Sequence, residues 1–87
     1  MPTISMFYGI IISMYGKNEH NPPHFHARYG EYNCVVDINK CEVITGNFPT
    51  KQSKLVIAWA ELHKEDLIAN WEIALNGGNL FEIQPLL

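Results

Sequence analysis

The segment HFHARYGEYNCVVD, residues 24–37, decides the fold of this chain. In its first six residues, polar or cationic side chains alternate with apolar ones without a break. A period of two is typical of a half-buried β-strand, because successive side chains point to opposite faces of a sheet. We therefore expect the apolar residues to face a core and the others to form a row on the opposite face, here called the histidine row: His24, His26 and Arg28.

The next two residues, Gly30 and Glu31, fit the loop of a type II′ hairpin turn, which takes glycine first. Directly opposed residues of a hairpin share a face. The turn therefore predicts three core-facing pairs: Tyr29 with Tyr32, Ala27 with Cys34, and Phe25 with Val36. On the other face it predicts three more: Arg28 with Asn33, His26 with Val35, and His24 with Asp37. A carboxylate at Asp37 would favour the imidazolium of His24 or orient its neutral ring.

The rest of the chain before Pro49 consists of short β-prone runs separated by turn residues. We expect a strand over residues 8–15, with residues 3–6 as a preceding piece broken near Gly9, and a polar loop over 16–23. Further strands are expected over residues 32–38 and 42–45. The sequence thus predicts an antiparallel sheet of three or four strands.

After Pro49 the apolar residues recur at helical spacing. Thr50 is the expected N-cap, and a break near His63 would place Asp66 in the first turn of a second helix. Trp59 and Trp71 are expected to anchor the core between helix and sheet. We predict one α+β domain over residues 1–87, in which one or two C-terminal helices pack against the sheet. Residues 1–48 are strand-rich, 50–78 helical and 79–87 an extended tail.

Composition excludes several classes of protein. A single domain of 87 residues with 47% hydrophobic residues is a folded globule rather than a disordered chain. The net charge of −3 argues against a broad nucleic-acid surface, which needs clustered Lys and Arg. The apolar run over residues 4–15 follows no basic residue and is too short to span a bilayer, so we expect a cytoplasmic protein without membrane contact. Cys34 and Cys41 form no C-x-x-C motif and are expected to be reduced, with Cys34 packed as a small hydrophobe.

Four interpretations of the histidine row remain open. His24 and His26 could chelate a divalent metal such as zinc, with His20, Asp37 or His63 as a further ligand. Alternatively, His24 and His26 act as acid and base while Arg28 binds an anion such as phosphate. The row could instead be a recognition surface for a protein partner, or a structural feature that only hydrogen-bonds neighbouring loops and helices.

The tail over residues 80–87 is apolar and is expected either to pack on its own domain or to dock on another chain. A segment of this kind gains most by covering a sheet edge or a neighbouring subunit. We therefore predict a homodimer or a complex with a small partner protein. Phe81 and Ile83 would then lie at or beside the buried contact.

Three stretches together resemble one family of small bacterial proteins, known as domain of unknown function 4160. They are residues 1–5 (MPTIS) with the following GIII strand, the block 20–27 (HNPPHFHA), and the segment from 59–63 (WAELH) to Trp71. The resemblance runs essentially from end to end. It implies a prokaryotic cytoplasmic setting and a gene that often lies beside another short one, as in a toxin–antitoxin pair. The family brings no established catalytic residues.

The chain departs from the family near Pro49, where it has only Lys51 and Lys54 in place of a more basic segment. That departure weakens the interpretation as an RNA-cutting toxin. The preferred function is therefore a non-enzymatic interaction or regulatory module, one component of a two-gene system. The alternative is a small metal- or anion-dependent hydrolase or nuclease that uses the histidine row.

Overall fold

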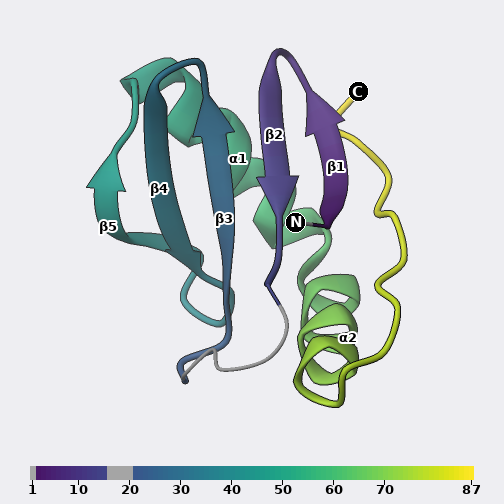
Figure 1. Ribbon diagram of the computed structural model, residues 1–87. Helices are drawn as coiled ribbons and strands as arrows, with labels where there is room; N and C mark the ends of the chain where they lie inside the picture. The colour runs from purple at the N-terminus through teal and green to yellow at the C-terminus, as the bar shows by residue number, and fades with distance from the viewer. Residues whose placement is uncertain (1, 16–20) are drawn as a thin grey trace.

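The computed structural model describes residues 2–15 and 21–87. In the described chain, five strands precede two helices: β1 (Thr3–Phe7), β2 (Ile10–Ser13), β3 (His24–Tyr29), β4 (Tyr32–Asp37), β5 (Glu42–Asn47), α1 (Thr50–Leu62) and α2 (Lys64–Leu75). The strands form one antiparallel sheet in chain order (Figure 1). The α+β class and the antiparallel sheet are confirmed, but the sheet has five strands rather than three or four.

The additional strand arises at a tight turn between β1 and β2. Phe7 pairs with Ile10, and both intervening residues have positive φ, 50° at Tyr8 and 79° at Gly9. Positive φ at both central positions is the requirement of a type I′ hairpin turn. The break expected near Gly9 is therefore the hairpin turn itself, and the strand expected over residues 8–15 begins only at Ile10 and ends at Ser13. A tyrosine is an unusual occupant of this backbone conformation, so only Gly9 marked the turn in the sequence.

The predicted hairpin is confirmed pair by pair. β3 and β4 pair from His24 with Asp37 to Tyr29 with Tyr32, in the register that the Gly30-Glu31 turn requires. Gly30 has φ of 58°, the positive value that the first position of a type II′ turn needs. One detail differs, because Tyr32 is 40% exposed and is not buried in the core, although it pairs with Tyr29.

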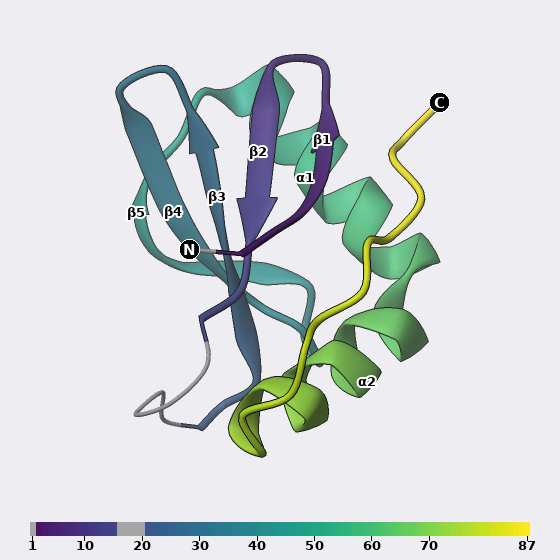
Figure 2. The same ribbon diagram turned by 45° about the vertical axis from the view of Figure 1, so that its right-hand side comes forward.

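Both helices lie on one face of the sheet (Figure 2). Trp59 and Trp71 are buried there as expected, and Trp59 packs against the rings of Phe7 and Phe25 at centroid distances of 5.4 and 5.7 Å. The other fully enclosed side chains come mainly from the alternating positions of β2, β3 and β4: Ile10, Ile12, Phe25, Val36 and their neighbours. The core therefore occupies the layer between sheet and helices. No helix of the described residues covers the opposite face of the sheet.

The two helices meet at His63, as predicted. His63 ends α1 by donating its backbone N–H to the carbonyls of Trp59 and Ala60, and it is also the residue before α2. Asp66 lies in the first turn of α2, where a negative charge interacts favourably with the helix dipole. At the other end of α1 the cap position is Pro49 rather than Thr50, which is the first helical residue.

The C-terminal tail packs on its own chain. The backbone N–H of Ile83 donates to the carbonyl of Ile4 in β1 at 2.8 Å, and the indole N–H of Trp59 donates to the carbonyl of Gln84 at 2.8 Å. The tail runs past α2 and along β1 (Figures 1 and 2). Ile83 is only 3% exposed and belongs to the core of its own domain, which is the first of the two alternatives for the tail. Phe81 remains 39% exposed, and the predicted self-association stays a prediction.

Both cysteines are free and buried, as expected. Burial raises the pKa of the Cys34 thiol to about 11 and also raises that of Cys41. A thiol with a raised pKa is protonated at neutral pH and is a poor nucleophile. In the part of the chain that the structure describes, neither helix has the length and hydrophobicity needed to cross a membrane.

Candidate functional site on the open face of the sheet

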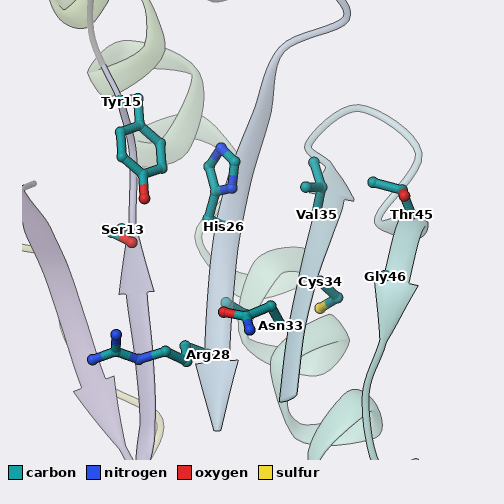
Figure 3. Close-up of a pocket in the computed structure, with 10 residues that line it drawn as sticks. Ser13, Tyr15, His26, Arg28, Asn33, Cys34, Val35, Thr45 and Gly46 are labelled. Carbon is teal, nitrogen blue, oxygen red and sulfur yellow. The ribbon is translucent and has the colours of Figure 1, made fainter. Parts of the chain in front are cut away.

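The helix-free face of the sheet contains a concave region of about 310 Å³, here called the hollow. Its lining comes from β2 to β5 and from Tyr15, which follows β2 (Figure 3). The polar side chains among the lining residues are Ser13, Tyr15, His26, Arg28, Asn33 and Thr45. The described lining contains an arginine and a histidine but no carboxylate.

Strand pairing places these side chains in two rows across the sheet. The first row passes from Ser13 through His26 and Val35 to Thr45, because each residue is the direct partner of the next. The second row lies two residues away along each strand and includes Arg28 and its partner Asn33. Two residues along a strand correspond to roughly 7 Å. The hollow therefore presents two parallel rows of polar groups at that spacing.

Arg28 provides the positive charge of the hollow. Its side chain is exposed and extends from β3 over β2, below Ser13 in the view of Figure 3. Among the described residues no carboxylate forms an ion pair with it. The Tyr15 ring lies on the other side of Ser13, with its hydroxyl directed toward that serine (Figure 3). Three hydrogen-bond donors of different types thus gather over β2.

His26 stands in the middle of the hollow. Its ring is half-buried and meets the ring of Tyr15 edge-on at a centroid distance of 4.4 Å. The same ring lies 5.4 Å from that of His24. His26 therefore lines the hollow with its ring packed between those of Tyr15 and His24.

His24 has a different environment from the other two members of the histidine row. Its Nδ1 atom lies 2.8 Å from the carbonyl oxygen of Pro22, and its ring lies 5.0 Å from that of Trp71 in α2. It is not one of the residues that line the hollow. The structure therefore brings His26 and Arg28 together at the hollow and places His24 beside it, against the helical layer.

Asp37 lies opposite His24 in the sheet, as the hairpin register predicts. The carboxylate is buried, and its Oδ1 atom accepts a hydrogen bond from the backbone N–H of Lys40 at 2.9 Å. The backbone carbonyl of Asp37 accepts from the N–H of Cys41 at 2.8 Å. Asp37 thus closes the turn between β4 and β5, which gives it a structural role in addition to its place beside His24.

The predicted metal site cannot be assembled from described residues alone. Among residues 2–15 and 21–87 there is no group of three His, Cys, Asp or Glu side chains placed to hold one metal ion. His63 lies at the helix junction, with its ring 5.5 Å from that of Trp59. His20 lies outside the described residues, so the site of His20, His24, His26 and Asp37 stays a prediction.

Sequence reasoning missed four members of the hollow as candidate site residues: Ser13, Tyr15, Asn33 and Thr45. Asn33 had been placed on the correct face, as the partner of Arg28, but without a role. Ser13 and Tyr15 alternate with the apolar Ile12 and Met14, which belong to the core, and this pattern places them on the opposite face, although Ser13 itself is only 4% exposed. The alternation was readable from the sequence, but no sequence motif specifies the register of β2 with β3 that brings Ser13 beside His26.

The fold and the hollow define a small α+β domain with one covered and one open sheet face. A family model described as domain of unknown function (DUF4160) matches residues 9–72, about three quarters of the chain. The chain therefore belongs to this family. No curated protein and no solved structure matches this chain significantly.

Proposed function

We propose that the protein is a non-enzymatic interaction or regulatory module, one component of a two-gene, toxin–antitoxin-like pair in the prokaryotic cytoplasm. It binds its small partner protein through the open face of the sheet. The observation that carries this proposal is the placement of both helices on one face, while the other face has a concave surface built from four strands. Concave surfaces with a few convergent polar groups are the usual sites of recognition.

The arrangement of the histidine row also favours binding over catalysis. An acid and a base that act on one phosphodiester must both reach the reacting atoms. His24 packs against Trp71 and its Nδ1 atom lies 2.8 Å from the Pro22 carbonyl oxygen, so of these two histidines His26 alone lines the hollow. A single imidazole beside an arginine is suited to holding a partner's polar groups.

The test is co-expression with the protein encoded by the neighbouring gene. We expect a stable complex on size-exclusion chromatography. Thr45→Arg places a large side chain in the hollow and should weaken the complex at least tenfold. The matched control is Leu62→Arg, which adds the same charge at a residue that is 70% exposed at the end of α1. If Leu62→Arg disrupts the complex and Thr45→Arg does not, or if no complex forms, the proposal is wrong.

The alternative function is a small hydrolase or nuclease that uses His24, His26 and Arg28. Two observations favour it: His26 and Arg28 line the same hollow, and the rings of His24 and His26 are 5.4 Å apart. It predicts cleavage of a fluorogenic RNA with a bell-shaped pH dependence, and a loss of about 100-fold or more in His26→Ala. Under the preferred function, purified protein cleaves no RNA. Cleavage that His26→Ala leaves unchanged would come from a contaminating nuclease.

A further inference from the structure

The local charge of the hollow is opposite to that of the whole chain. The sequence has nine acidic and only six basic residues. Nevertheless, the described lining of the hollow includes the single arginine of the sequence and no Asp or Glu. Its remaining polar groups are two aliphatic hydroxyls, a phenol, an amide and an imidazole, each of which can donate a hydrogen bond. A concave site of donors around a guanidinium favours an anion.

The spacing of the two rows limits the size of the anion. Arg28 and Asn33 lie in one row, and Ser13 and His26 lie in the other. The rows are roughly 7 Å apart between backbone positions along the strands. The long Arg28 side chain extends over β2 below Ser13 (Figure 3), so one oxyanion bound between Arg28 and the row of Ser13 can accept hydrogen bonds of about 2.7–2.9 Å from both. Arg28 matches two oxygens of a phosphate at once, which a lysine at the same place would not.

The volume and charge of the hollow indicate a small anionic ligand rather than a nucleic-acid strand. A hollow of about 310 Å³ lies at the lower end of the range of small-molecule sites, about 300–1,000 Å³. A nucleic-acid strand needs several phosphate contacts from Lys and Arg, and the described lining offers one arginine. The ring of Tyr15, edge-on to His26, provides an apolar surface beside the anion for an organic group.

We propose that the hollow binds the phosphate group of a small phosphorylated molecule, with Arg28 as the bidentate partner of the phosphate and Ser13, His26 and Asn33 as further donors. The inference rests on the proposed function in that it treats the open face of the sheet as the binding surface. Ligand binding itself requires only the isolated chain.

The test is a titration of the full chain with inorganic phosphate, adenosine 5′-monophosphate and adenosine, followed by NMR of the backbone amides. We expect phosphate and the monophosphate to shift the amides of Ser13, His26 and Asn33, and adenosine to shift none. If the natural ligand is free phosphate, inorganic phosphate and adenosine 5′-monophosphate should bind with equal affinity. If it is an organic phosphate, the monophosphate should bind more tightly than inorganic phosphate.

Arg28→Ala should weaken binding of the monophosphate roughly tenfold to a hundredfold, the loss of a charged hydrogen-bond pair. Arg28→Lys should recover only part of it. Lys54→Ala is the matched control, because it removes one exposed positive charge on α1 and should leave binding unchanged. Equal losses in Arg28→Ala and Lys54→Ala, shifts outside the open face, or tighter binding of a single-stranded RNA than of the monophosphate would overturn the inference. Partner binding that persists while all phosphates fail would contradict only this inference and not the proposed function.

Discussion

The side-chain amide of Asn70 makes two hydrogen bonds with the backbone of Phe81, one with its carbonyl oxygen and one with its N–H group. Its Nδ2 donates to the Phe81 carbonyl at 2.9 Å, and its Oδ1 accepts from the Phe81 N–H at 3.0 Å. Asn70 is fully buried in α2, so the amide replaces a strand partner for the tail. This contact, together with the Ile83–Ile4 hydrogen bond, fastens the C-terminus to the domain.

The first prediction follows from this pair. Asn70→Leu keeps the volume but leaves both polar atoms of Phe81 without their partner, and we expect it to lower the free energy of unfolding by about 2–4 kcal/mol. Thermal unfolding should show a fall of about 10–20 °C in Tm. Chymotrypsin should also cut after Phe81 faster. Asn79→Leu, at an exposed position of the same segment, should change the stability by less than about 0.5 kcal/mol.

The second prediction concerns the turn between β1 and β2. Tyr8 is 60% exposed and has φ of 50°, a conformation that costs an ordinary residue about 1 kcal/mol and costs asparagine less. Tyr8→Asn should therefore raise the free energy of unfolding by about 0.5–1 kcal/mol, measured by urea denaturation. Tyr8→Val should lower it, because a β-branched residue is poorly tolerated there. If Tyr8→Asn and Tyr8→Val change the free energy of unfolding in the same direction, side-chain contacts of Tyr8 outweigh its backbone strain and the prediction is wrong.

The features of this fold that the sequence predicts best are those between residues close together in the chain. The β3–β4 hairpin was correct in every pair because a two-residue turn with glycine first fixes the register locally. At the β1–β2 turn only the break near Gly9 was predicted, and Tyr8 was assigned to the following strand because a tyrosine gives no signal for positive φ. Both hairpin turns require positive φ, but only the β3–β4 turn has a glycine at its first position to indicate it.

The hollow depends on less local information. The pairing of β4 with β5 has a register shift between Val35 and Val36. The partner of Thr45 therefore cannot be predicted by counting residues from the β4–β5 turn. Gly46 shows the constraint there, because an added Cβ would lie 2.4 Å from the backbone oxygen of Asn33. That close approach of two backbones is a tertiary property, and from sequence the glycine is indistinguishable from an ordinary loop residue.

The third prediction tests the metal hypothesis with zinc. If His24 and His26 belong to a zinc site, zinc at a hundred times its Kd should raise the free energy of unfolding by about 2.7 kcal/mol. The measurement is thermal unfolding at pH 7.5, above the ordinary imidazole pKa, with tag-free protein. His24→Ala should abolish the increase. An unchanged Tm with zinc and with nickel would exclude a metal site at the histidine row.

The fourth prediction concerns Cys34, whose thiol pKa is raised to about 11 by burial. The protonated thiol should react with a disulfide reagent at pH 8 only when the protein unfolds. Because the folded pKa exceeds the ordinary value of 9.0, the contribution of the thiol to stability is complete below pH 9 and is lost as the pH rises toward 11. Cys34→Ala should therefore lose less stability than wild type across that interval. Rapid labelling of Cys34 in folded protein at pH 8 would contradict its burial.

The last prediction concerns self-association through the tail. Ile83 is buried in the core of its own domain, whereas Phe81 is 39% exposed. Substitutions of these two residues should therefore have different effects. Ile83→Ala should lower the free energy of unfolding by about 2–4 kcal/mol, because it opens a cavity, and should leave the oligomeric state unchanged. Phe81→Arg should keep the Tm nearly constant but shift a homodimer to monomer in size-exclusion chromatography with light scattering. An intact protein that is monomeric at high micromolar concentration would exclude the homodimer. A dimer that Phe81→Arg leaves intact would place the contact elsewhere on the domain.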